Sequence, residues 1–289
     1  MTDKQHVELG GVAETLMIPL WCRAVETERG RALLRDPKAR EIVAQLDYDF
    51  DRRFAGLRAL AFRACLRTVM IDRWVQAFLR AHPAGVVVEI GTGLNTRFER
   101  LDNGSVRWFD LDLPDSLALR RRFFTDSARR TMIEGAFGDH AWIDELHQQL
   151  TADGDHGADR PIMFVSEAVL VYLTEPTVRR GFDQLAEVFP ASEFVFDTVS
   201  RAALAASDRP MMQTYQAPFV WGCDDPSPIE AWGHQLVART TMAELPFAVR
   251  RRVPLEHRIA WPYLRLFRSQ RLRSHALNRF RLRPAREHA

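Results

Sequence analysis

The apolar residues of the N-terminal part of the chain follow the spacing of helices. Between residues 11 and 46 the pattern is interrupted, and a short amphipathic helix is predicted after Asp36-Pro37. A longer helix is predicted over residues 56–81. It should end before His82-Pro83, because the residue that precedes a proline avoids the helical conformation. Residues 1–82 are therefore expected to form an N-terminal helical lid.

From residue 83 onward, apolar runs alternate with helical stretches. The pattern predicts strands at residues 85–90, 105–111, 161–166 and 193–198, and helices at about residues 116–130 and 175–189. The first run is continuous and β-branched, which is typical of a strand buried on both faces of a parallel sheet. The alternation predicts an α/β fold, with a Rossmann-like, mostly parallel and doubly wound sheet in residues 83–200.

Two later segments depart from this alternation within what we interpret as one domain, residues 1–289. Residues 201–235 are rich in aromatic residues, methionine and proline, and are expected to form a cap insertion that either covers an acceptor or only packs on the core. Residues 236–289 are expected to complete the sheet and end in an Arg-rich helix, with an added arm as the alternative. The arginines of residues 250–286 indicate a solvated helix face, or a site for an acidic acceptor or a carrier protein.

Composition excludes several classes of function. Hydrophobic residues make up 46% of the 289 residues, and the net charge of +2 is too small to predict nucleic-acid binding by itself. Cys22, Cys65 and Cys223 lie far apart, and the acidic loop at residues 153–159 lacks EF-hand spacing, so neither disulfides nor a metal site are expected. We recognise no signal peptide and no apolar run of about 20 residues, which predicts a cytoplasmic protein without a membrane partner.

The most informative motif, Val88-Glu-Ile-Gly91-Thr-Gly93, follows the first predicted strand. Glycines in a strand-to-helix turn let the backbone approach a ligand closely. A dinucleotide motif would place a third glycine where this chain has Thr96, so the motif favours S-adenosylmethionine (SAM), which has no pyrophosphate. Glu89 is also more usual in methyltransferases than in dehydrogenases, and it becomes a candidate cofactor residue.

An acidic pair, Asp110 and Asp112, ends the second predicted strand. It lies about 20 residues after Gly91, the separation expected of a carboxylate that accepts hydrogen bonds from a ribose. The alternative is that the two side chains cap the next helix and form its preceding turn. Position and chemistry agree, so both residues are candidates for cofactor binding.

These motifs, taken together, resemble the leucine carboxyl methyltransferase family, especially its bacterial, tetracenomycin-like branch of polyketide-type O-methyltransferases. The resemblance extends over about residues 12–235 and rests on the sequence text of residues 18–24, 89–98, 100–114, 166–173 and 221–225. It implies a class I SAM-dependent methyltransferase fold. Position 92 is Thr, where the family usually has cysteine or alanine, and position 95 is Asn, where the family usually has aspartate. The affinity for the cofactor is therefore expected to differ from that of typical family members.

The resemblance also implies roles for individual residues. Arg67 would pair with the methionine carboxylate of SAM, and Glu167 would face its amino group. Gly91 and Gly93 would line the turn, and Asp112 would hold the ribose. Glu167 follows a predicted strand directly, which agrees with this role because open α/β sheets bind ligands at the carboxyl ends of their strands.

Four further residues are candidates for the site. The resemblance implies that Asp139 and His140 lie near the adenine, and a looser alignment places Arg23 near the cofactor. His140 is a candidate general base, with a surface or helix-capping histidine as the alternative. Tyr172 is a second candidate for the catalytic pocket, although a tyrosine after an apolar strand is often part of the core.

The sequence therefore predicts a SAM-dependent O-methyltransferase that acts on a carboxylate or hydroxyl of a small natural product. One alternative is a protein C-terminal carboxyl methyltransferase. Others are a SAM-binding protein of the same fold without methyl transfer, and a fold that has lost its cofactor and serves as an interaction module. A carboxylate acceptor needs no base, whereas a hydroxyl does better with one. The sequence does not indicate the oligomeric state.

Overall fold

The computed structural model describes residues 5–6, 15–54, 56, 58–152, 160–205, 218–253 and 273–284. Several expectations lie outside these residues: the methionines at positions 211 and 212, the acidic loop at residues 153–159, and most of the Arg-rich segment. Within the described residues, no helix is both long enough and apolar enough to cross a bilayer.

In the described parts of the chain, seven strands form one sheet, and two very short strands form a separate parallel pair. The seven are β3 Val86–Ile90, β4 Arg107–Asp112, β5 Arg130–Glu134, β6 Ile162–Ser166, β7 Glu193–Val199, β8 Gln235–Thr241 and β9 His275–Arg281. The short pair is β1 Gln5–His6 with β2 Leu46–Asp47. The order of the large sheet is β5-β4-β3-β6-β7-β9-β8. The first five strands in this order run parallel, and β9 is antiparallel to both of its neighbours.

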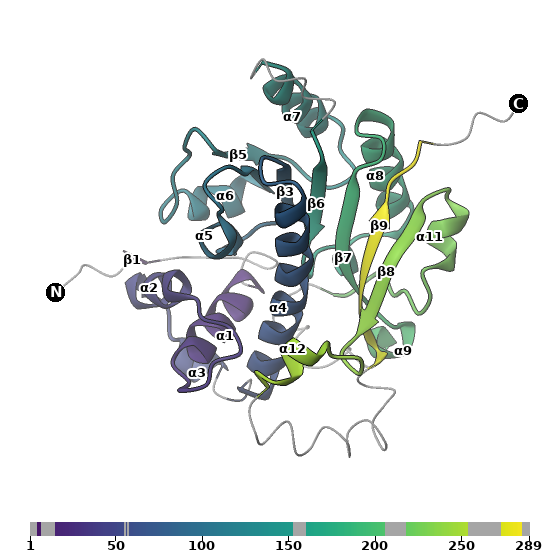
Figure 1. Cartoon of the computed structure of the whole chain (residues 1–289). Coiled ribbons are helices and arrows are strands. Elements are labelled where there is room, and N and C mark those ends of the chain that lie inside the picture. The colour runs from purple at the N-terminus through teal and green to yellow at the C-terminus, as the bar shows by residue number, and fades with distance from the viewer. Residues whose placement is uncertain are drawn as a thin grey trace, which may run out of the picture.

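Helices cover both faces of this sheet (Figure 1). They are α1 Met17–Thr27, α2 Pro37–Gln45, α3 Phe50–Phe54, α4 Arg58–Ala81, α5 Arg97–Leu101, α6 Pro114–Arg120, α7 Ala141–Ala152, α8 Glu175–Val188, α9 Arg201–Ala205, α11 Ser227–Ala231 and α12 Phe247–Arg250. A short 3₁₀ helix, η4, spans Leu170–Tyr172. The predicted helices at residues 56–81 and 175–189 are thereby confirmed, and Pro176 stands in the first turn of α8 as expected.

The alternation of side chains along the strands separates two apolar cores. Val87 of β3 faces the core that contains α1 and α4, together with α5 and α6. Its neighbour Val88 faces the opposite core, where α7, α8 and α11 lie. Figure 1 shows α4 crossing one face of the sheet, with α1, α2 and α3 beside its lower half. Both faces are therefore buried, which explains why the strand at residues 86–90 is apolar throughout.

The structure corrects the predicted helix at residues 116–130. Helix α6 ends at Arg120, and Arg130 begins strand β5. The prediction failed because β5 is only five residues long and its outer positions are polar: Arg130 is buried in an ion pair and Glu134 is exposed. Sequence periodicity has little to detect in so short a strand.

The C-terminal region completes the sheet, and part of the predicted Arg-rich helix is instead strand β9. Seven residue pairs join β9 to β7, from Glu193 opposite Arg281 to Val199 opposite His275. Arg279 extends from β9 to the carboxylate of Glu193, at 2.7 Å from both oxygens. The arginines of β9 thus form cross-strand ion pairs with β7. The expectation that these arginines lie on the surface of a helix does not predict such pairs.

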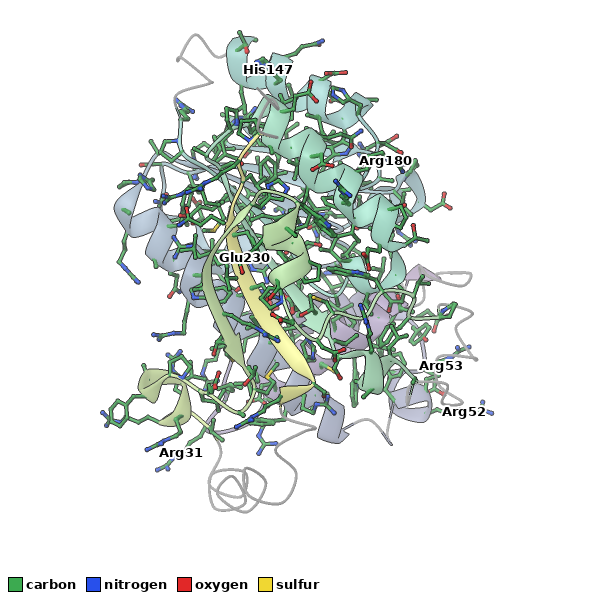
Figure 2. The ribbon with its side chains drawn as sticks, turned by 90° about the vertical axis from the view of Figure 1, so that its right-hand side faces the viewer. Arg31, Arg52, Arg53, His147, Arg180 and Glu230 are labelled. Carbon is green, nitrogen blue, oxygen red and sulfur yellow. The ribbon has the colours of Figure 1, made fainter. Side chains whose placement is uncertain are left out.

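Part of the predicted cap insertion belongs to the core. Ile229 of α11 is fully buried, and Trp221 is nearly so, in the cluster that also contains Phe182 of α8 and Phe280 of β9. Figure 2 looks toward the β8 side of the sheet and shows α11, marked by Glu230, lying against β8 and β9. A cap role for the remainder of residues 201–235 stays a prediction.

Candidate cofactor site

The glycine motif forms a tight turn at the carboxyl end of β3. Gly91 and Gly93 have φ angles of +67° and +50°, in the left-handed region that glycine adopts readily. The backbone N–H groups of Gly91 and Thr92 both donate to the carbonyl of Leu111, at 2.8 and 3.0 Å, which ties the turn to β4. These hydrogen bonds hold the turn in a conformation in which its backbone can contact a ligand closely.

Asp112 lies beside this turn, at the end of β4. Its Oδ2 accepts the N–H of Gly93 at 2.6 Å, and its Oδ1 accepts the N–H of Leu113 at 2.8 Å. Burial raises the pKa of the Asp112 carboxyl, and these hydrogen bonds oppose that shift. The N-cap position of α6 belongs to Leu113, whose side chain makes no cap hydrogen bond. Asp112 also accepts the Ser116 hydroxyl from the first turn of α6, so it contacts both the glycine turn and this helix, and its ligand-binding role stays a prediction.

Asp110 has a different environment from Asp112. It is fully buried, and its carboxylate contacts Arg130 at 2.6 Å, Arg120 at 3.1 Å, the Thr92 hydroxyl at 3.0 Å and the Trp108 indole at 3.2 Å. Burial raises the pKa of Asp110, but the two guanidinium groups outweigh it and hold the pKa below its ordinary value. This geometry favours support of the glycine turn, through Thr92, over direct contact with a ribose.

Glu167 projects from the carboxyl end of β6 into a set of donors. Its Oε1 accepts Arg67 Nε at 2.9 Å and the Thr68 hydroxyl at 2.7 Å, and its Oε2 accepts Arg97. Burial acts to raise the pKa of Glu167, but the two guanidinium groups hold it far below its ordinary value. Ala168, the next residue, has a φ angle of +59°, unusual for a residue other than glycine and a form of strain that concentrates at functional sites.

Arg97 joins three carboxylates that come from different elements. Its side chain has no exposed surface, and it contacts Asp72 of α4 at 2.7 Å as well as Glu89 and Glu167. Asn95 donates a second hydrogen bond to Glu89 Oε1, at 2.7 Å. Sequence reasoning quoted Arg97 as part of a motif but assigned it no role. Only the three-dimensional structure shows that Arg97 connects α4 to the sheet by ion pairs.

These ion pairs continue from one residue to the next across the site. The connected side chains are Arg23, Asp36, Arg100, Asp72, Arg97, Glu89, Glu167, Arg67 and Asp197. Five of these are carboxylates and four are guanidinium groups, so the network has one negative charge in excess when Glu89 is ionised. Glu89 Oε2 is buried and has no hydrogen-bond partner among the residues that the structure describes. SAM carries a sulfonium and an ammonium against one carboxylate, so its net positive charge fits this site.

Arg23 supports the turn from outside. It is buried, and its guanidinium donates to Asp36 at 2.9 Å and to the carbonyl of Leu94 at 2.7 Å. Asp36 in turn accepts the N–H of Ala39, which caps α2. Both hydrogen-bond acceptors of the Arg23 guanidinium belong to the protein itself. The geometry therefore favours a positioning role for Arg23 over direct contact with SAM.

The remaining candidates lie in a loop before α7 and in η4. Asp139 and His140 are exposed before α7, and His140 Nδ1 lies 3.0 Å from Asp144, one turn further along the helix. His140 therefore has the exposed, surface position that the sequence left as one alternative for it. Tyr172 is half-buried, with its hydroxyl bonded to Thr15 and its ring 5.3 Å from that of Phe219.

Sequence reasoning missed two residues at this edge of the sheet. Asp197 of β7 lies 3.6 Å from Arg67 Nη1, and His275 of β9 lies 2.7 Å from Asp197. An acidic residue near the end of an apolar strand, as in Glu193–Thr198, was a signal that could have identified Asp197. No comparable signal marks His275, because its strand was not recognised.

The environment of Glu89 leads to a pH-dependent prediction. Burial raises the pKa of Glu89 from 4.5 to about 7; Arg97 opposes this, and Asp110 adds to it. The folded state then binds a proton more tightly than the unfolded state, so this group's contribution to stability falls as pH rises from about 4.5 to about 7. We expect wild type to lose on the order of 1 kcal/mol or more relative to Glu89→Gln between pH 5 and 8, measured by urea denaturation. A constant difference between the two proteins over this range would contradict the expectation.

The fold and the site together define a class of protein. A mostly parallel sheet with the antiparallel strand β9 between β7 and the edge strand β8, a glycine turn after β3 and an acidic residue at the end of β4 are the features of a class I, Rossmann-like SAM-dependent methyltransferase. The chain belongs to the leucine carboxyl methyltransferase family, whose family model matches residues 17–186.

Similarity to known methyltransferases and to a solved structure agrees with this assignment. The tetracenomycin polyketide synthesis O-methyltransferase of Streptomyces glaucescens is 30% identical over 84% of this chain and 87% of that protein. A SAM-dependent methyltransferase of Gibberella zeae is 26% identical over 79% of this chain and 80% of that protein. A DUF574 family protein from Streptomyces avermitilis, whose structure is solved, matches 91% of this chain and 97% of its own with a TM-score of 0.55. At 15% identity, this likeness shows the fold alone.

Proposed function

We propose that this methyltransferase transfers a methyl group from SAM to an oxygen atom, hydroxyl or carboxylate, of a small natural-product acceptor. The observation that carries the proposal is the 30% identity, over most of both chains, to the tetracenomycin O-methyltransferase. The site agrees with it, because Glu167, Arg67 and Asp112 gather at the carboxyl ends of β6 and β4 around the glycine turn. We place the protein in the cytoplasm, as predicted from its sequence.

In this proposal SAM supplies a methyl group on a positively charged sulfur, and the chain's residues hold and orient it. Arg67 binds the methionine carboxylate, Glu167 accepts from the amino group, and Asp112 accepts from the ribose hydroxyls. The Asp112 carboxylate accepts two backbone N–H groups and the Ser116 hydroxyl, which leaves about one of its roughly four acceptor positions for this purpose. Asp139 lies at the adenine end. Fixing the donor in this way contributes proximity and alignment, the main requirements of an in-line methyl transfer.

The N-terminal segment supports a place for the acceptor. Leu16 lies against Gly93, because a Cβ atom added to this glycine would meet Leu16 Cδ2 at 2.7 Å. Thr15 bonds the Tyr172 hydroxyl, and Phe219 contacts the same ring. Three segments far apart in sequence therefore meet over the site. We propose that they exclude water and that Tyr172 and Phe219 form an apolar wall for the acceptor.

The ribose role of Asp112 can be tested by calorimetry with S-adenosylhomocysteine (SAH). We expect Asp112→Ala to weaken SAH binding at least tenfold, about 1.4 kcal/mol, because the ribose hydroxyls lose their acceptor. The matched control is Asp115→Ala, three residues along the chain, where the side chain is exposed. Equal affinities of both variants for SAH would remove Asp112 from the site.

The methyl transfer itself is tested by incubating the enzyme with SAM and a panel of aromatic polyketides. We expect SAH to form only with an acceptor, and mass spectrometry to locate the added methyl group on oxygen. A folded protein that binds SAH and methylates none of the panel would instead favour SAM binding without methyl transfer. Turnover of a peptide bearing a free C-terminal carboxylate would favour the protein methyltransferase alternative.

A further inference from the structure

We propose that His275 is the general base of this enzyme and that the acceptor is therefore a hydroxyl compound, a phenol or an alcohol, rather than a carboxylate. This inference rests on the proposed O-methyl transfer and narrows it. The observation that carries it is a carboxylate–histidine pair, Asp197 with His275, at the edge of the sheet where Glu167 and Arg67 lie.

The topology places this pair beside the cofactor residues. Asp197 lies near the carboxyl end of β7 and bonds the N–H of Ala168, the residue after Glu167, at 2.6 Å. Because β9 runs antiparallel to β7, its first residue, His275, lies at the same edge, opposite Val199. If the strand next to β7 ran parallel to it, only the last residues of that strand would reach this edge of the sheet. The antiparallel strand brings His275 there with its first residue.

The hydrogen bond fixes which nitrogen of His275 can act as a base. Burial acts to raise the pKa of Asp197, but Arg67 and His275 outweigh it and hold the pKa below its ordinary value. An ionised carboxylate only accepts hydrogen bonds, so His275 Nε2 carries the hydrogen that Asp197 Oδ2 accepts at 2.7 Å. In the neutral ring, Nδ1 is then the basic nitrogen. Within the described part of the chain Nδ1 has no hydrogen-bond partner, and the side chain is 14% exposed.

The groups around the ring suit this role. Asp197 faces it from β7, Arg67 reaches Asp197 from α4, and Glu167 pairs with Arg67 from the end of β6. On the β8 side, the N–H of Met242 bonds the His275 carbonyl, and Glu244 follows two residues later. Asp197 both orients the imidazole and stabilises the imidazolium that forms when it accepts a proton. His140, by contrast, is 46% exposed and has only a surface carboxylate beside it.

The proposed methyl transfer with His275 as the base conserves atoms and charge. As the acceptor oxygen attacks the methyl carbon, its proton moves to His275 Nδ1 and the electron pair of the carbon–sulfur bond stays on sulfur. The imidazolium later releases this proton to water. A carboxylate acceptor has no such proton at neutral pH and gains nothing from the base.

The test compares His275→Gln with His234→Gln, using a naphthol and the matching naphthoic acid as acceptors. Glutamine keeps an N–H donor for Asp197 and removes the base. His234, buried against Phe182 on the opposite core, controls for loss of a buried histidine. We expect His275→Gln to lower kcat for the naphthol about 100-fold. Its SAH affinity and any turnover of the naphthoic acid should change less than about twofold. Added imidazole should restore naphthol turnover by His275→Gly.

Nitrogen NMR shifts of His275 give a readout that does not depend on turnover. We expect a hydrogen on Nε2 and none on Nδ1 in the neutral ring. A hydrogen on Nδ1, or unchanged naphthol turnover by His275→Gln, overturns the inference. Wild-type turnover of the naphthoic acid alone also overturns it but leaves the proposed O-methyl transfer standing. If neither probe reacts while SAH binds, the result counts against the proposed function, and the nitrogen shifts then decide the inference.

Discussion

Replacing Arg97 with methionine is expected to destabilise the protein by about 3–5 kcal/mol, the usual effect of removing one partner from a buried ion pair. The arginine side chain has no exposed surface, and the substitution leaves Asp72, Glu89 and Glu167 near one another without their shared cation. Methionine preserves most of the apolar stem, so the loss is one of charge and hydrogen bonds rather than of volume. The measurement is the free energy of unfolding in urea.

The matched control is Arg129→Met. Arg129 also pairs with a carboxylate, Asp102, but its side chain is 37% exposed, and exposed pairs contribute about 0–1 kcal/mol. If both substitutions lower the free energy of unfolding by the same small amount, the buried network is not what holds α4 and α5 to the sheet. If Arg97→Met does not fold at all, a result that Arg129→Met does not share, the prediction holds in its stronger form.

Substituting alanine for Gly91 is expected to lower stability by about 3 kcal/mol or more, and SAH binding with it. Two effects add at this position. A residue with a side chain at a φ angle of +67° is strained by about 1–2 kcal/mol. The new Cβ would also lie 2.3 Å from Val169 Cγ2, an overlap that forces the segment after Glu167 to move, for about another 1–3 kcal/mol.

Gly104→Ala separates these two effects. Gly104 has a φ angle of +82°, and no heavy atom lies within 4 Å of an added Cβ, so only the backbone strain applies. We expect a loss of about 1–2 kcal/mol in urea denaturation, with SAH affinity unchanged. Equal losses for the two glycines would mean that Val169 moves aside without consequence. The close approach at Gly91 would then matter for the ligand only.

Local patterns in the sequence were sufficient to predict the strands β3, β4, β6 and β7 and the position of the candidate site. The apolar run at residues 86–90, the glycine turn and the position of Glu167 after a strand each depend on neighbouring residues in the chain. Strand ends and glycine conformations are local properties, so sequence reasoning reached them. The family resemblance added SAM, and the family assignment confirmed it.

The partners of the charged residues could not be read in this way. Asp110 and Asp112 are two residues apart and look equivalent in the sequence, yet one binds two arginines from other elements and the other binds the glycine turn. Which carboxylate meets which arginine depends on how α4, α5 and β5 approach β4. Long-range packing sets that approach, and a window of neighbouring residues carries no information about it.

The sequence alone determined that this chain forms a Rossmann-like sheet with a glycine turn, because those features follow from local periodicity and backbone chemistry, and the family resemblance assigned this turn to SAM. The tertiary structure alone decided that a tail rich in arginine becomes the antiparallel strand β9. Only this pairing brings His275 within hydrogen-bond distance of Asp197, across 78 positions of the chain. Strand pairing is chosen by the fold as a whole, since the same residues would suit a surface helix if β7 offered no partner.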